Sequence, residues 1–120
     1  MPSKLSSSSG VVFLDRARAT AEVRRAVARL AERVQGVREV WLFGSLARGN
    51  ATPRSDADLM IVVDEDTRRP MDRIPRFLSL LDDLGRPVDL TVVTAGEWKR
   101  GENSPFRREV LAHGIRLHPP

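Results

Sequence analysis

The sequence predicts an α/β (α+β) fold, a small mixed sheet of three to four strands flanked by helices. Apolar segments recur at 37–43, 59–63 and 88–93, and the one at 59–63 is continuous and largely β-branched. Amphipathic segments of helical period lie before and between them. The first apolar segment has apolar side chains on both faces, so we expect helices on both sides of the sheet.

Composition excludes several protein classes. The 120 residues contain no cysteine, which removes disulfides, thiolate catalysis and cysteine zinc sites. No apolar run approaches the roughly 20 residues that span a bilayer, and the N-terminus lacks the apolar core of a secretory signal. We therefore expect a cytoplasmic protein with a disordered tail at 1–10 and a single domain at 11–120. The net charge of +4 is modest and interspersed, so it permits nucleic-acid binding without indicating it.

The first half of the chain predicts a helix, a strand, a short turn and a second strand. Apolar residues at offsets of 0, 4, 7, 8 and 11 from Val23 predict a helix over 14–35. The strand at 37–43 follows, and a short helical turn closed at Gly49 leads through a polar loop to the strand at 59–63.

The second half predicts a long helix, a strand, a closing helix and an edge strand. The apolar spacing predicts one continuous helix over 71–84, and the strand at 88–93 follows it. We expect irregular chain over 94–103. The Ser-Pro pair at 104–105 is typical of a helix start, and this helix ends near residue 113. Residues 115–117 then form a short edge strand.

Three aspartates are candidate metal ligands. Asp56 and Asp58 stand at i and i+2, so on a strand they point to the same face with Cα atoms roughly 6.5–7 Å apart. Asp89 is the one charge in an apolar strand, and a buried carboxylate there needs a cation, donors or water beside it. If the strands are adjacent, the three carboxylates converge and repel one another, and a divalent cation reverses that repulsion. Oxygen ligands suit Mg²⁺ or Mn²⁺, and two such ions about 3.5–4 Å apart bridge an attacking hydroxyl and phosphoryl oxygens.

The turn before the carboxylates has the chemistry of a phosphate site. Gly44 permits close backbone approach, and Ser45 offers a hydroxyl at the start of a short helix. Arg48, one turn further, is placed to neutralise charge on a leaving pyrophosphate. Ser55 is placed to orient the first carboxylate or metal-bound water, and Arg54 is a weaker candidate for phosphate contact.

These residues together resemble the DNA polymerase β-type nucleotidyltransferase superfamily, and the compact length resembles its minimal nucleotidyltransferase (MNT) branch. The resemblance rests on the pattern GS-x₂-RG-x₅-SDxDL at 44–59, followed by Asp89 in a later strand. It extends over about 40–117 and includes RREVLAHGIRL, which is similar to the closing helix and strand of the branch. His113 departs from the acidic residue often found before that glycine.

The resemblance implies a nucleotidyltransferase fold, a mechanism and a partner. In such a site Asp56 and Asp58 hold both metals, Asp89 holds the catalytic metal and helps activate the acceptor hydroxyl, and Gly44 and Ser45 grip the triphosphate. The implied activity is transfer of a nucleoside monophosphate, commonly AMP from ATP, with release of pyrophosphate. Many minimal members are encoded beside an all-helical HEPN-type toxin and act as its antitoxin by modifying a toxin tyrosine.

Two alternative functions stay open on the sequence. One keeps the fold but makes it a non-catalytic antitoxin that neutralises its toxin by occlusion. The other is a nucleotidyltransferase acting on a small molecule or an RNA end. We interpret Trp41 and Trp98 as packing residues, and His113 and His118 as helix-end and surface residues.

Overall fold

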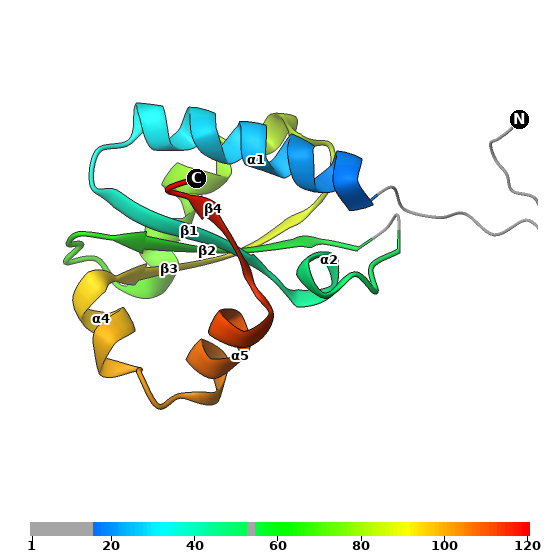
Figure 1. Cartoon of the computed structure of the whole chain (residues 1–120). Helices are drawn as coiled ribbons and strands as arrows, with labels where there is room; N and C mark the ends of the chain where they lie inside the picture. Colours follow the sequence, from blue (N-terminus) through cyan, green and yellow to red (C-terminus); the bar gives the residue numbers. More distant parts are fainter. Residues whose placement is uncertain (1–15, 53–54) are drawn as a thin grey trace, which may run out of the picture.

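Four strands form one sheet in the order β3-β2-β1-β4 (Figure 1). The computed structural model describes residues 16–52 and 55–120, so the expected tail at 1–10 lies outside the described residues. The strands are β1 (Val37–Phe43), β2 (Ala57–Val63), β3 (Val88–Thr94) and β4 (Ile115–His118). β1 pairs antiparallel with both β2 and β4, whereas β2 and β3 are parallel. The predicted mixed sheet flanked by helices is therefore confirmed.

Helices cover both faces of this sheet. They are α1 (Arg16–Arg33), α2 (Gly44–Arg48), α3 (Ile74–Leu78), α4 (Ala95–Arg100) and α5 (Pro105–His113), with 3₁₀ turns η2 (Pro70–Arg73) and η3 (Asp82–Leu84). Figure 1 shows α1 above the sheet and α4 and α5 below it. In the described ranges, no helix combines the length and apolar content needed to cross a bilayer.

The alternation of side chains along β2 divides the core into two layers. Leu59 and Ile61 pack with the buried face of α1, while Met60 and Val62 point to the other layer, where Val110 of α5 is buried. All of these side chains are essentially inaccessible to solvent. Because successive strand residues face opposite sides, each layer fixes the register of β2 independently.

The predicted continuous helix over 71–84 is wrong. The segment divides into η2, α3 and η3, which are separated by turns. Pro75 has no N–H to bond to the carbonyl four residues earlier, so the Met71 carbonyl accepts from Ile74 in a tighter turn. The expected irregular segment 94–103 instead contains α4, whose first turn is closed by a capping box between Thr94 and Glu97.

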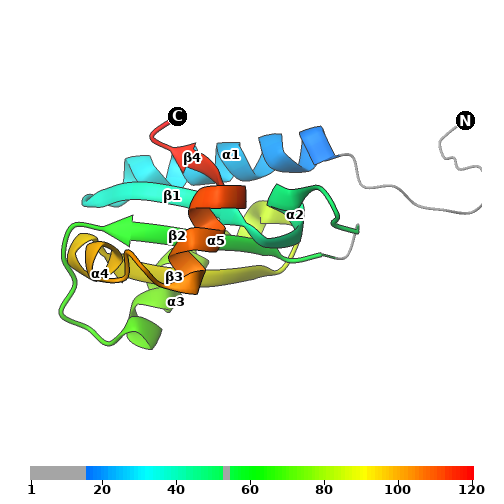
Figure 2. The same ribbon diagram turned by 60° about the horizontal axis from the view of Figure 1, so that its bottom comes forward.

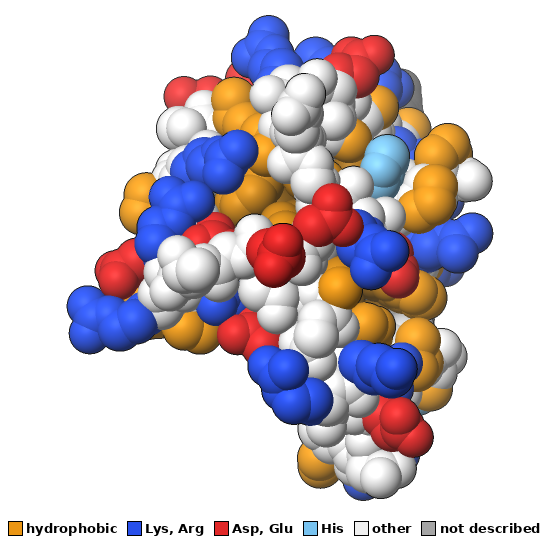
Figure 3. Space-filling view, turned by 90° about the vertical axis from the view of Figure 1, so that its left-hand side faces the viewer, with side chains coloured by type: hydrophobic (Ala, Val, Ile, Leu, Met, Phe, Trp, Pro, Cys, Tyr) orange, Lys and Arg blue, Asp and Glu red, His pale blue; other side chains and the backbone are white. Residues whose placement is uncertain are grey.

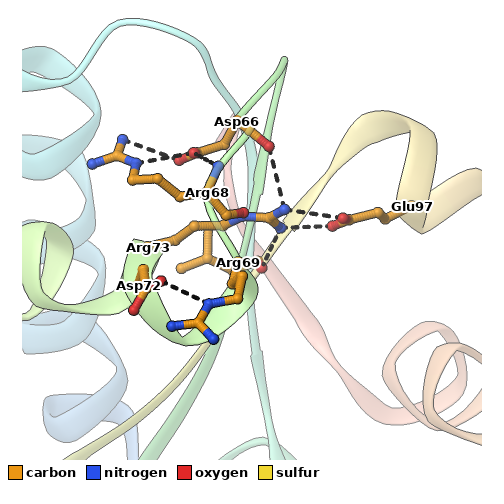
Figure 4. Close-up of polar contacts among 7 residues, drawn as sticks. Asp66, Arg68, Arg69, Asp72, Arg73 and Glu97 are labelled. Atoms are coloured by element: carbon orange, nitrogen blue, oxygen red, sulfur yellow. Dashed lines mark hydrogen bonds and ion pairs between the residues drawn. The ribbon is translucent and has the colours of Figure 1, made fainter.

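Arg73 is the buried charge that ties these short elements to the sheet (Figure 4). Its guanidinium donates to both carboxylate oxygens of Glu97, at 2.7 and 3.0 Å, and to the carbonyl of Val92 at 3.2 Å. The carbonyls of Asp66 and Arg68 accept from it as well. One side chain therefore joins η2, the outer strand β3 and α4.

The surface at the end of the sheet away from α2 carries both signs of charge. Figure 3 shows Lys and Arg side chains interspersed with Asp and Glu over this end. The ion pairs of Arg38 with Asp64 and of Arg68 with Asp66 belong to it. This view agrees with the interspersed charge expected from composition.

The Arg73–Glu97 pair predicts a pH-dependent stability. The hydrogen bonds from Arg73, followed by the backbone N–H of Thr94, lower the pKa of Glu97 from 4.5 to about 2. Because the folded-state pKa is depressed, the stabilisation is complete above about pH 4.5 and is lost as the pH falls toward 2. Glu97→Gln should lower the free energy of unfolding by about 2 kcal/mol at pH 7, because Arg73 stays buried without its anion. The variant should also lose less of its free energy of unfolding than the wild type does as the pH falls from about 4.5 toward 2. Urea unfolding at several pH values measures both effects.

Asp72→Asn is the matched control for this prediction. It removes a carboxylate from the exposed Arg69–Asp72 pair nearby, at 3.2 Å, and should cost less than about 0.5 kcal/mol. Equal losses in the two variants would contradict a special role for the buried pair.

Candidate active site

Asp58 and Asp89 lie side by side at the end of the sheet next to α2. The parallel register pairs Asp58 of β2 with Asp89 of β3, and the antiparallel register pairs Asp58 with Phe43 of β1. Neighbouring strands are about 4.8 Å apart, so these side chains form a row on one face of the sheet. Asp56 is exposed and directly precedes β2, two residues from Asp58.

Negative charge accumulates around Asp58. Partial burial raises the pKa of the Asp58 carboxyl, the charges of Asp89 and then Asp56 raise it further, and Arg48 opposes them. Asp89 and Asp56 therefore both act electrostatically on Asp58. A bound cation would relieve this repulsion.

The expectation that Asp89 is buried is wrong. Its side chain is exposed, although it belongs to an otherwise apolar strand. β3 is the outer strand of the sheet, and position 89 is the second residue of that strand. Water therefore solvates the Asp89 carboxylate, so the residue needs no cation or donor to offset burial. The feature that points to a site is the pairing of Asp89 with Asp58 in the register of β2 and β3.

Gly44 brings the backbone of the turn against the Asp58 carboxylate. Its φ is +72°, in the left-handed region that favours glycine. A Cβ at this position would overlap Oδ2 of Asp58 and lie 2.9 Å from its Cγ. Any side chain at 44 would therefore displace the carboxylate as well as strain the backbone.

The turn itself is the short helix α2, closed by Gly49 at φ +84° as the sequence predicts. Its first N–H groups have no partner within the helix, and the N-cap residue Phe43 has no side chain that accepts from them. At five residues α2 has little macrodipole, so Ser45 and the free backbone N–H groups are what it offers an anion. Arg16 of α1 holds the other end by donating to the carbonyls of Leu46 and Ala47.

The remaining residues predicted from the sequence, Arg48, Ser55 and Arg54, differ in how they relate to the aspartates. Arg48 donates from Nη1 to Oε2 of Glu109 at 3.1 Å, yet it is near enough to lower the pKa of Asp58. The Ser55 hydroxyl accepts from the Thr52 N–H at 2.9 Å, so it closes the loop that precedes Asp56. Arg54 lies outside the described residues.

The donor set fits a hard divalent cation in its chemistry. Two carboxylates in register and a third two residues away supply oxygen ligands, and the pKa of Asp58 is raised by burial and then by the charges of Asp89 and Asp56. As placed, no three His, Asp or Glu side chains within 16–52 and 55–120 stand close enough to surround one ion. A cation held by all three aspartates would therefore require their carboxylates to rotate inward.

Two residues that act on this site were missed in the sequence. Arg16 anchors α2 from 30 residues away, and Glu109 contacts Arg48 from 61 residues away. No local pattern marks either, because both are charged residues on helix surfaces. By contrast, the start of α4, which was also missed in the sequence, carries a local signal, because the Thr94-x-x-Glu97 spacing is a capping-box pattern.

The close approach at Gly44 predicts a position-specific cost of adding a methyl group. Gly44→Ala should lower the free energy of unfolding by about 2–3 kcal/mol, because backbone strain adds to overlap with Asp58. Gly85→Ala is the matched control, since Gly85 has φ +79° but nothing within 4 Å of the added Cβ. It should cost about 1 kcal/mol from strain alone. Urea denaturation measures both, and equal losses would refute the contact.

Comparison with known proteins agrees with this architecture. A candidate nucleotidyltransferase from Sulfolobus solfataricus has a TM-score of 0.54 at 28% identity, covering 71% of this chain and 75% of that one. A toxin–antitoxin crystallised with AMP-PNP has a TM-score of 0.55 at 22% identity, and an MntA-HpeT toxin–antitoxin variant has 0.58 at 21%. Each of these two covers 78% of this chain and 71% of its own, and the likeness establishes the fold.

The family assignment comes from the sequence comparison. No curated protein matches the chain. The nucleotidyltransferase domain family matches residues 23–118, which span α1 from Val23, the whole sheet and both halves of the candidate site. The chain therefore belongs to the nucleotidyltransferase domain family.

Proposed function

We propose that this nucleotidyltransferase transfers AMP from ATP, with Mg²⁺, to a hydroxyl group of a protein partner. The observation that carries the proposal is the in-register pair Asp58–Asp89, which lies against the Gly44 turn. Carboxylates that repel one another beside free backbone N–H groups suit a metal ion and a phosphate together.

The transfer is an in-line displacement at the α-phosphorus. The acceptor oxygen forms a bond to this phosphorus while the bond to the β-phosphate oxygen breaks, and pyrophosphate leaves with the bonding electrons. Magnesium, when bound, supplies charge neutralisation and orientation of the phosphates. The exposed carboxylate of Asp89 takes the hydroxyl proton, and Asp56 and Asp58 hold the metal in place.

The turn residues bind the part of the nucleotide that leaves. Backbone N–H groups at Gly44 and Ser45, with the Ser45 hydroxyl, accommodate the triphosphate oxygens. The Arg48 guanidinium offsets the charge that grows on the leaving pyrophosphate. Ser55 contributes by closing the loop before Asp56 through its bond from Thr52, so it orients the metal-binding carboxylate indirectly.

An open site favours a macromolecular acceptor. Asp56 and Asp89 are exposed, and the groove of about 520 Å³ between α1 and β4 contains neither of them. A chain of this size then relies on the acceptor molecule to complete the site and exclude water. Similar folds occur in toxin–antitoxin proteins, one crystallised with AMP-PNP and one a variant with two Asp-to-Glu changes two positions apart. That is the spacing of Asp56 and Asp58. The likeness to toxin–antitoxin proteins supports a toxin as the partner, and we propose that it is of the HEPN type.

The catalytic proposal predicts loss of transfer when either paired aspartate is neutralised. Asp58→Asn and Asp89→Asn should each lower AMP transfer at least about 100-fold, because charge stabilisation at the reacting phosphorus is lost. The measurement is the mass of a purified HEPN-type toxin after incubation with the chain, ATP and Mg²⁺. Asp72→Asn, an exposed acid on η2, is the control and should keep full activity.

The same experiment separates catalysis from occlusion. A mass increase of one AMP on the toxin supports transfer. A stoichiometric complex whose toxin keeps its mass identifies an antitoxin that acts by occlusion, and it contradicts the proposed reaction.

If Asp58 binds Mg²⁺, Asp58→Asn should stabilise the chain in the absence of divalent ions but remove the stabilisation that Mg²⁺ gives. Without divalent ions, Asp58→Asn should raise the free energy of unfolding by roughly 0.5 kcal/mol, or about 2–4 °C in melting temperature, because like-charge repulsion is removed. Adding Mg²⁺ should stabilise the wild type and leave the variant nearly unchanged. Thermal melting with EDTA and with Mg²⁺ measures both. A variant that gains as much from Mg²⁺ as the wild type would place the ion elsewhere.

A further inference from the structure

Helix α5 is fastened to the turn that carries the candidate phosphate site. The Phe106 ring meets the Phe43 ring edge to face, with centroids 5.3 Å apart and planes at 88°. Three residues further along α5, Oε2 of Glu109 accepts from Nη1 of Arg48 at 3.1 Å. Figure 2 shows α5 lying beside α2. Residues distant in sequence therefore flank the turn at both of its ends.

Arg48 is held by Glu109 at the end of α2. Nη1 of Arg48 donates to Oε2 of Glu109, and the same short helix begins at Gly44, whose backbone lies against the Asp58 carboxylate. A guanidinium has five N–H donors in a fixed fork, and the single contact with Glu109 uses one of them. The side chains of Arg48 and Glu109 are 44% and 40% exposed, so the remaining donors are open to a ligand from solvent.

We propose that Glu109 is a positioning residue that holds the Arg48 guanidinium at the turn, oriented to bind the β- and γ-phosphates of the nucleotide. This inference rests on the proposed nucleotidyl transfer and adds the residue that orients its phosphate-binding cation. Glu109 itself touches neither phosphate nor metal. The ion pair restricts the rotamers of the long Arg48 side chain before the nucleotide binds. Less side-chain entropy is therefore lost when the phosphates are bound.

The alternative is that the pair merely attaches α5 to the rest of the fold. Two other contacts already make that attachment, because Val110 is fully buried in the core layer and Phe106 meets Phe43 edge to face. An exposed ion pair adds little to stability. The fold should therefore survive loss of Glu109, which makes its effect on nucleotide binding measurable.

Calorimetric titration of the full chain in Mg²⁺ with ATP and with AMP tests the proposal. AMP lacks the two phosphates that Arg48 would contact, so it reports on the remainder of the site. Glu109→Gln should weaken ATP binding about three- to five-fold and leave AMP binding unchanged. In an Arg48→Gln background the same change should have no further effect. Glu102→Gln, an exposed acid between α4 and α5, is the charge-matched control and should bind ATP as the wild type does.

The exchanged pair, Arg48→Glu with Glu109→Arg, separates positioning from attachment. It restores an ion pair between the helices but replaces the cation at the turn with a carboxylate, so α5 should stay attached, as shown by a single cooperative melting transition, and ATP should bind no more tightly than it does to Arg48→Gln. Wild-type ATP affinity in Glu109→Gln or in the exchanged pair would overturn the proposal, as would equal losses for ATP and AMP. Failure of the wild type to bind ATP with Mg²⁺ would overturn the proposed function itself, a result distinct from these.

Discussion

The contact between the Gly44 backbone and the Asp58 carboxylate is the constraint on which the site depends. A strand must end and reverse into a helix at the one residue type that tolerates both a φ of +72° and a carboxylate in the space of a side chain. The approach places free backbone N–H groups and metal-type ligands within one small region. In the proposed function, this approach lets the turn and β2 act together on a phosphate and a cation, and a side chain at position 44 would separate the two.

The parallel pairing of β2 and β3 supplies the second half of the site. A parallel neighbour needs a crossover, and here the crossover consists of η2, α3 and η3. It returns the chain to the same end of the sheet, so Asp89 starts its strand beside Asp58. At the far end of β3, Arg73 binds the Val92 carbonyl and Glu97, which fixes the outer strand. These contacts hold β3 at the end opposite Asp89.

Sequence patterns predicted the parts of this fold that depend on local signals. The first strand and the closing helix were placed at their observed bounds, because apolar runs, a Ser-Pro start and glycine stops act within a few residues. The helix over 71–84 failed because periodicity persists across Pro75 while the hydrogen-bond ladder does not. The exposure of Asp89 depends on β3 being an outer strand, which is a property of topology and not of residues 88–93.

The candidate site shows the same division between local and distant information. Asp56, Asp58 and the Gly44-Ser45 turn belong to one short segment of the sequence. That the turn lies near the two carboxylates could therefore be predicted. Glu109 reaches Arg48 across 61 positions, and only the packing of α5 against β1 and α2 brings them together. Charged residues on helix surfaces have many possible partners, and the sequence does not choose among them.

Charge repulsion in the unliganded site also links ligand binding to folding. Partial burial, and then the like charges of Asp89 and Asp56, raise the pKa of Asp58, so ionising this carboxylate in the folded chain without a cation has a desolvation cost and an electrostatic cost. A cation that binds the folded site but not the unfolded chain removes this cost and adds its own binding free energy to stability. In the proposed function, the carboxylates that would hold a cation would therefore also make the domain more stable when the cation is bound, while the exposed Asp89 would stay open to an acceptor supplied by another molecule.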